Sequence, residues 1–123
     1  MQAESGKLYL IPTTLGDNEP MQVLPVTVQS TVMQLQYFFV ENEKSARRFI
    51  KAIAPQKAQN ELILFILNKY ADIKESSNFL DNCAKGISVG LLSEAGTPAI
   101  ADPGAQVVMM AHERNIKVVP LVG

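Results

Sequence analysis

Short apolar runs alternate with amphipathic stretches along this chain. Runs typical of strands, rich in β-branched and aromatic residues, occur at 7–12, 37–40, 62–67, 87–92 and 116–121. The run at 62–67 is too short for a buried helix, and its unbroken apolar character predicts a strand covered on both faces. Polar turn residues bound each run, as expected for strands that alternate with other elements.

The clearest helix is predicted over 43–54, where Pro55 ends the pattern. Its apolar face consists of Ala46, Phe49, Ile50 and Ile53. The stretch 21–35 is ambiguous, because its β-branched residues favour a strand whereas Pro25 suits a first helical turn. Val28, Val32 and Leu35 recur at helical spacing. We predict a helix there.

Two more helices are expected in the second half of the chain. Ser76 or Ser77 is predicted to cap a helix that passes through Leu80 and Cys83 and ends at Gly86. A second helix is predicted over 105–113, with its inward side chains at Val107, Val108 and Ala111. The alternation predicts an α/β fold with a parallel five-stranded sheet and helices on both faces.

Composition suits one globular domain. The 123 residues are 47% hydrophobic and 19% charged, enough for a core without disulfides or metal. The single cysteine excludes an internal disulfide and favours a reducing, cytoplasmic setting. We expect neither a signal peptide nor a membrane span, because residues 1–6 lack the signal pattern and the longest apolar run is 62–67. The net charge of −1 requires any binding to nucleic acid to be local.

Ligands of parallel sheets bind at the carboxyl ends of the strands, and the loop 93–104 is the richest candidate there. Gly96 and Gly104 allow the backbone to approach a ligand closely, while Pro98 and Pro103 fix its path. A rigid strand-to-helix connection explains the same composition equally well. The chain has neither the Gly-x-Gly-x-x-Gly pattern nor a Gly-Lys-Ser/Thr motif, which argues against a Rossmann dinucleotide site and a P-loop.

Five segments occur in an order that resembles the tetrapyrrole methylase superfamily, with the ribosomal RNA small subunit methyltransferase I type as the most similar branch. They are Lys7-Leu-Tyr-Leu-Ile-Pro-Thr13, Gly16-Asp17, Val40-Glu-Asn-Glu-Lys-Ser-Ala-Arg-Arg48, Ser93-Glu-Ala-Gly-Thr-Pro-Ala-Ile-Ala-Asp-Pro-Gly104 and Lys117-Val-Val-Pro-Leu-Val-Gly123. The twelve residues from Ser93 to Gly104 are the most specific of these motifs.

The resemblance implies a two-domain, homodimeric enzyme that holds S-adenosylmethionine in a cleft between an amino-terminal α/β domain and a carboxyl-terminal one. Residues 1–123 would be the first domain only, inactive by itself, with the second domain absent from the chain. The cofactor contacts that the resemblance implies are Leu15, Gly16, Ala95, Gly96, Thr97, Ile100 and Ala101. Glu94 would favour the positive sulfonium or amino group, although a solvated loop acid explains it as well.

The sequence departs from the branch at three places. Glu41-Asn42-Glu43-Lys44 replaces the usual Glu-Asp-Thr-Arg, and 68–72 lacks the usual histidine. The first loop reads Thr13-Thr-Leu-Gly-Asp-Asn18 where the branch has Thr-Pro-Ile-Gly-Asn. These departures keep the expected cofactor binding and leave open a substrate other than ribosomal RNA.

Glu41 and Asp102 are the candidate catalytic acids, since a ribose hydroxyl acceptor benefits from a base. Asp102 is better explained as the cap of the helix that begins near Gly104. The candidate RNA surface is the basic helix face of Lys44, Arg47, Arg48 and Lys51, with Lys57 nearby; a solvated face is the simpler explanation. We expect no metal site, because His112 has no second ligand at a suitable spacing, and we expect Cys83, Met109 and Met110 to fill the core.

The function expected from these features is S-adenosylmethionine-dependent 2′-O-methylation of a ribose in small subunit ribosomal RNA. Two alternatives remain open. One is a methylase of a tetrapyrrole or another small molecule, and the other is a divergent module that binds the cofactor or a partner without catalysis.

Overall fold

The computed structural model describes residues 5–13, 26–67, 73–93 and 104–121. In chain order the elements are β1 (Leu8–Pro12), α1 (Val26–Gln34), β2 (Tyr37–Val40), α2 (Glu43–Ile53), the 3-10 turn η2 (Gln59–Glu61), β3 (Ile63–Ile66), α3 (Ile73–Ala84), β4 (Val89–Ser93), α4 (Gly104–Glu113) and β5 (Val118–Pro120). The strands and helices predicted from the sequence are all present within the described residues. Residues 21–25 of the ambiguous stretch lie outside them.

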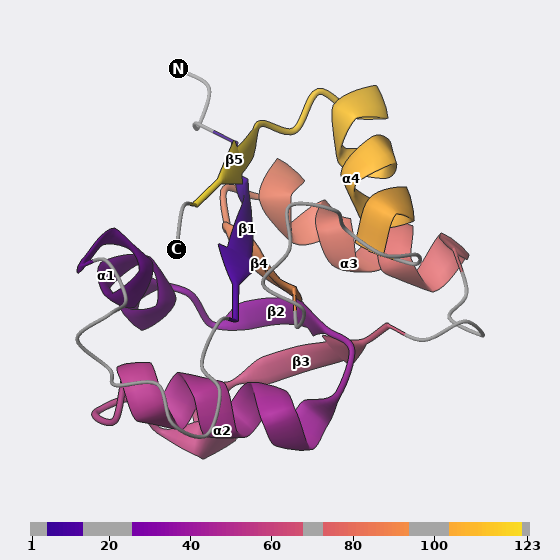
Figure 1. Cartoon of the computed structure of the whole chain (residues 1–123). Coiled ribbons are helices and arrows are strands. Elements are labelled where there is room, and N and C mark those ends of the chain that lie inside the picture. Colours follow the sequence, from indigo (N-terminus) through magenta and orange to yellow (C-terminus); the bar gives the residue numbers. More distant parts are fainter. Residues whose placement is uncertain (1–4, 14–25, 68–72, 94–103, 122–123) are drawn as a thin grey trace.

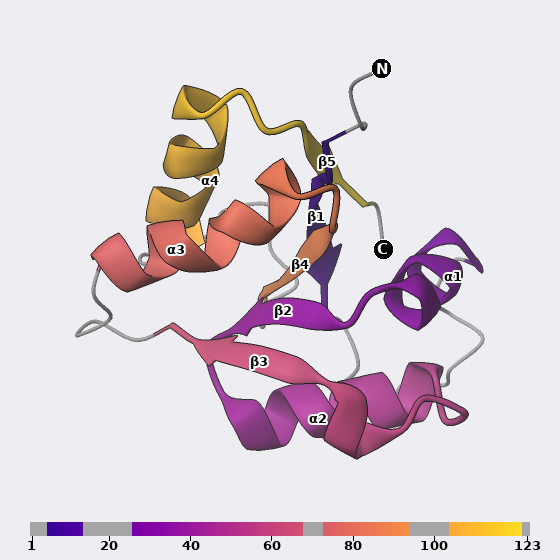
Figure 2. The ribbon, with the colours of Figure 1, turned by 180° about the vertical axis from the view of Figure 1, so that it is seen from behind.

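The five strands form one sheet in the order β3-β2-β4-β1-β5, and every pair is parallel. Helices α1 and α2 cover one face of the sheet, and α3 and α4 cover the other (Figures 1 and 2). This arrangement confirms the predicted α/β class with its parallel sheet between two helical layers. Parallel strands need such crossovers, because each connection has to return along the sheet before the next strand begins.

Each face of the sheet has its own apolar core. The first core joins Val28 and Val32 of α1 and the inward residues of α2 to the side chains of Ile11 and Phe38. The second core contains Leu8, Phe39, Leu67, Leu80, Cys83, Val89, Leu91, Val107, Ala111 and Ile116. Alternate residues of β1 and β2 therefore enter opposite cores, as the two-residue period of a strand requires.

Helix α2 forms as its sequence pattern predicts. Its four inward residues are buried, and the Asn42 side chain caps it by accepting a hydrogen bond from the Ser45 amide at 2.9 Å. The amide of Ala54 still donates to the Ile50 carbonyl, and the helix ends there, before Pro55.

Strand β3 corrects the prediction of a strand covered on both faces. It lies at the edge of the sheet and pairs only with β2. Leu64 and Phe65 pack against the two cores, but Ile63 and Ile66 are 39% and 38% exposed. A run of apolar residues cannot distinguish an edge strand from a central one, because strand order depends on contacts that are distant in the sequence.

Two smaller predictions were also wrong. Helix α3 begins at Ile73, so Ser76 and Ser77 lie inside the helix and neither caps it; Ser76 is buried. On α4, Met109 is 62% exposed, and Met110 is only partly buried against the second core. Met109 projects away from the core because only the face of α4 that carries Val107 and Ala111 is fully buried.

Helices α3 and α4 end in the same type of cap. After α3, the Gly86 amide donates to the Cys83 carbonyl, and the Ile87 amide donates to Asn82, with Gly86 at a φ of 91°. After α4, Asn115 has a φ of 60° and takes the corresponding place, with its amide donating to His112. These are Schellman caps, in which a left-handed residue reverses the chain. Each cap directs the chain back into the next strand.

Candidate functional site

The sheet order places the carboxyl ends of three neighbouring strands side by side. We call the end of the sheet at which the strands finish its carboxyl edge, as distinct from the outer strand β3. Strand β4 lies between β2 and β1, and Pro12 of β1 is in register with Ser93 of β4. The chain leaves β1 and β2 toward the helices on one face, whereas after β4 it continues to α4 on the other face. Ligands of open parallel sheets bind where neighbouring strands diverge in this way. The candidate site is therefore the edge formed by the ends of β1, β4 and β2.

The residues predicted to contact the cofactor belong to the segments that follow these strand ends in the sequence. Leu15 and Gly16 follow β1, and the others follow β4, namely Ala95, Gly96, Thr97, Ile100 and Ala101. All seven lie outside the described residues, as do Glu94 and Asp102. What the described structure adds is that the two segments start from neighbouring, in-register strands.

Glu41 is the one predicted catalytic acid within the described residues. It directly follows β2 at the carboxyl edge, is half-buried, and precedes the capping residue Asn42 of α2. A carboxylate at the start of a helix is favoured by the exposed amides of the first turn. The fold thus brings Glu41 to the same edge as Thr13 and Ser93, each of which directly precedes one of the two candidate loops in the sequence.

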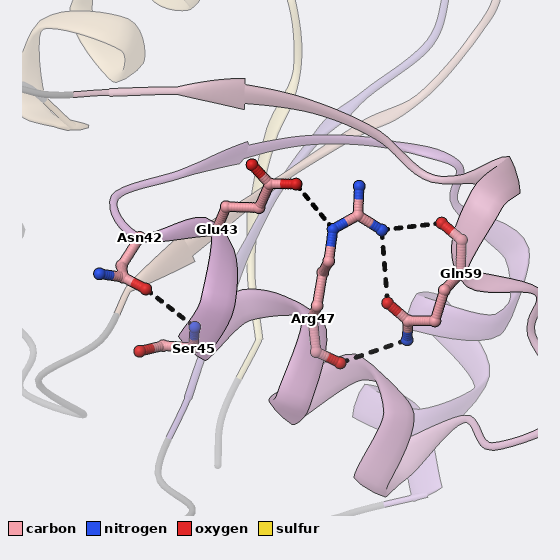
Figure 3. Close-up of polar contacts among 5 residues, drawn as sticks. All are labelled: Asn42, Glu43, Ser45, Arg47 and Gln59. Carbon is pink, nitrogen blue, oxygen red and sulfur yellow. Dashed lines mark hydrogen bonds and ion pairs between the residues drawn. The ribbon is translucent and has the colours of Figure 1, made fainter.

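Arg47 departs from the predicted basic face, because its guanidinium is engaged within the protein (Figure 3). Its Nε forms an ion pair with Glu43 at 2.8 Å, and its Nη1 donates to the main-chain carbonyl of Gln59 at 2.8 Å. Gln59 returns a hydrogen bond from its side-chain amide to the Arg47 carbonyl at 3.3 Å. These contacts join α2 to the η2 turn that precedes β3. Helical spacing placed Arg47 on the basic face, but it gave no indication of the contacts with Gln59.

Lys57, a second cation of this layer, is also engaged. Its Nζ donates to the Met33 carbonyl at 3.0 Å, near the end of α1. Lys44, Arg48 and Lys51 are exposed, and within the described part of the chain no hydrogen bond or ion pair holds their side chains. The structure thus divides the basic residues of this layer into two that are held and three that face solvent.

Other candidate groups contribute little to this edge. Cys83 is fully buried in the second core, as predicted, and burial raises the pKa of its thiol to about 11. Among the described residues no three His, Cys, Asp or Glu side chains are grouped so that they could hold a metal ion. The helices of the described ranges are all too short or too polar to cross a bilayer.

A cavity of about 380 Å³ lies at the opposite, amino-terminal edge of the sheet. It opens between the end of α1 and the turn after α3, and residues such as Gln36, Tyr37 and Ser88 line it. All three lie at or just before the beginnings of strands, so the cavity is separate from the candidate site at the carboxyl edge.

Comparisons with known proteins identify relatives of the chain. A protein of Buchnera aphidicola subsp. Acyrthosiphon pisum named ribosomal RNA small subunit methyltransferase I is 32% identical over 118 residues, 96% of this chain. Its namesake from Borrelia garinii subsp. bavariensis is 33% identical over 116 residues, 94% of this chain. The chain is a homologue of these methyltransferases. It spans only 39% and 48% of their lengths, and the matched part is amino-terminal. No family model matches.

The fold has a counterpart among solved structures. The crystal structure of uroporphyrin-III-C-methyltransferase from Thermus thermophilus superposes with a TM-score of 0.64, over 96% of this chain and 47% of that one. The sequence identity is 14%, so this likeness concerns the fold alone. It confirms the predicted α/β fold class of this chain.

Proposed function

We propose that this chain is the amino-terminal, cofactor-binding part of an S-adenosylmethionine-dependent methyltransferase that modifies small subunit ribosomal RNA. The similarity to ribosomal RNA small subunit methyltransferase I, which extends over 96% of the chain, carries the proposal. The geometry supports it, because the segments with the predicted cofactor residues follow the neighbouring strand ends at Pro12 and Ser93.

S-adenosylmethionine supplies a methyl group on a positively charged sulfur, and a nucleophilic oxygen can displace that sulfur in line. The protein's task in such a transfer is mainly to hold donor and acceptor in contact. In our proposal the small residues Gly16, Ala95 and Gly96 leave space for the donor, and Ile100 forms an apolar wall. Glu41 lies at the end of β2 beside β4, where a carboxylate can accept the proton that the attacking hydroxyl loses.

The finer features belong to the same proposal. The methyl acceptor in this proposal is a ribose 2′-hydroxyl, and the enzyme acts in the cytoplasm, where its ribosomal substrate is. A carboxyl-terminal domain forms the second wall of the cofactor cleft, and the whole enzyme is a homodimer. The matched relatives are two to three times longer than the matched segment, which supports a further domain.

The proposal can be tested in a chimera in which residues 1–123 replace the matched segment of the Buchnera relative. The purified chimera is incubated with methyl-labelled S-adenosylmethionine and undermethylated small ribosomal subunits. We expect label in the RNA at a ribose 2′-oxygen. We also expect Gly96→Val to abolish cofactor binding, because its side chain would fill the space that the glycine leaves.

The unmodified relative and the thermal unfolding of the chimera serve as controls. A folded chimera that binds the cofactor but leaves the RNA unlabelled would contradict the ribosomal substrate and favour a small-molecule acceptor. A folded chimera that binds no cofactor would contradict the methyltransferase proposal. Full cofactor binding by Gly96→Val would show that the loop is assigned wrongly.

A further inference from the structure

We propose that Lys44, Arg48 and Lys51 form a surface that binds the phosphate backbone of RNA, and that Arg47 is not part of it. We call these three residues the α2 stripe. The inference rests on the proposed RNA substrate and assigns a docking surface to it.

The α2 stripe faces directly away from the sheet. Its residues are spaced four and three apart, so they follow one another along a single face of the helix. The buried residues Ala46, Phe49, Ile50 and Ile53 occupy the opposite face. At 1.5 Å per residue the stripe extends for roughly 10 Å, which is long enough for its cations to contact different phosphates.

The neighbouring cations are held in place, which defines the limits of the stripe. Arg47 is fixed by Glu43 and Gln59, and Lys57 donates to the Met33 carbonyl. A guanidinium with an ion pair and a carbonyl partner would have to lose both contacts before it could bind a phosphate. The side chains of the stripe have no such contacts to lose within the described residues.

The stripe is also placed suitably for a substrate of the candidate site. Helix α2 begins at Glu43, two residues after Glu41 and just past the carboxyl end of β2. Lys44 therefore lies at the end of the stripe nearest the candidate site, and Lys51 lies at the far end. A polyanion bound along the stripe would run toward the edge where β1, β4 and β2 end.

An anionic membrane fits this helix less well than RNA does. Helices that lie in a membrane surface insert an exposed apolar face. The apolar face of α2 is buried against the sheet, and the large hydrophobic residues that are exposed in the described structure lie on other elements. The stripe consequently offers charge without an apolar anchor.

The inference can be tested by NMR titration of the isotope-labelled chain with a short single-stranded RNA at several KCl concentrations. We expect amide shifts along α2, together with an affinity that falls as salt rises. The triple variant Lys44→Gln, Arg48→Gln, Lys51→Gln should bind more weakly and should lower the log–log salt slope by about 2, since each phosphate contact contributes about 0.7.

Two controls separate the stripe from other cations. Arg47→Gln should lower the unfolding temperature through the lost contacts with Glu43 and Gln59 while leaving the salt slope unchanged. The double variant Lys85→Gln, Lys117→Gln removes exposed charges outside α2 and should change neither quantity.

Three results would overturn the assignment: no RNA binding by the parent chain, an unchanged slope in the triple variant, or a slope change in Arg47→Gln alone. A different outcome would assign the stripe to a membrane. In that case the parent would bind phosphatidylglycerol vesicles but not RNA, and the triple variant would no longer bind the vesicles. Methyl transfer by the chimera is measured separately. If the chimera labels RNA but one of these three results is obtained, the assignment of the α2 stripe as an RNA-binding surface is contradicted, and the proposed function is not.

Discussion

Arg47 and Arg48 are adjacent in the sequence, yet only one of them is committed to the protein's own structure. Arg47 bonds to Glu43, one turn away, and to Gln59, twelve residues away, whereas Arg48 is exposed. The ion pair has a spacing that the sequence can suggest. The contact with the Gln59 carbonyl depends on how the chain folds after α2. Helical spacing contains no information on that contact, so it placed both arginines on one basic face.

The Cys83 thiol predicts a pH dependence of stability. Burial raises its pKa from 9.0 to about 11. Between these values the unfolded chain has released the proton while the folded chain keeps it, so rising pH favours unfolding. The thiol's contribution to stability is complete below pH 9.0 and is lost as pH rises toward 11, by at most about 2–3 kcal/mol.

Urea unfolding of the parent chain and Cys83→Ala at a series of pH values tests this prediction. All other ionisable groups are common to both proteins, so their effects cancel in the comparison. The stability advantage of the parent over Cys83→Ala should shrink as the pH rises above 9.0. A constant difference would contradict the raised pKa.

At the scale of elements, the chain's periodicity predicted most helices and strands well. The spacing of apolar residues in α2 reflects one buried face, and the strand 37–40 was predicted with its observed bounds. The start of α3 was missed because serine caps helices but is also tolerated within them, and here Ile73 precedes Ser76 by three residues. Boundaries of this kind depend on capping contacts that the residue types do not fix.

The caps of α3 and α4 provide a prediction at this scale. Gly86→Ala should destabilise the chain by about 1–2 kcal/mol, because a side chain is strained in the left-handed conformation. Thermal and urea unfolding measure this cost. Asn115→Gly is the matched control, since glycine adopts the φ of 60° without strain, and it should leave stability unchanged or higher. Equal stability of Gly86→Ala and the parent would contradict the role of the cap.

At the scale of the whole molecule, Gly90 shows how closely the side chains of neighbouring strands pack in the sheet. It lies in the central strand β4, in register with Tyr9 of β1 and Phe38 of β2. A Cβ atom at this position would lie 2.8 Å from the Phe38 ring and 3.0 Å from the Ile11 side chain. Three strands therefore come together at a residue that has no side chain.

Gly90→Ala should lower the free energy of unfolding by about 1–3 kcal/mol, the usual cost of overpacking a core. Urea unfolding provides the measurement. Gln106→Ala, an exposed change on α4, should alter stability by less than about 0.5 kcal/mol. A Gly90→Ala protein as stable as the parent would show that Phe38 and Ile11 can move aside without cost.

The sequence by itself determined the α/β class, the positions of most elements and the buried face of α2. It could do so because a period of two or of about 3.6 residues records which side of an element is buried. The short segments 7–13 and 93–104 also indicated the homology, since motif order is a property of the sequence.

Only the tertiary structure decided the order β3-β2-β4-β1-β5, and with it the edge position of β3 and the adjacency of the β1 and β4 ends. It also separated Arg47 from the α2 stripe by giving it Gln59 as a partner. Both outcomes depend on contacts between segments that are distant along the chain. Local periodicity contains no information on such contacts, because it reports that a face is buried but not what buries it.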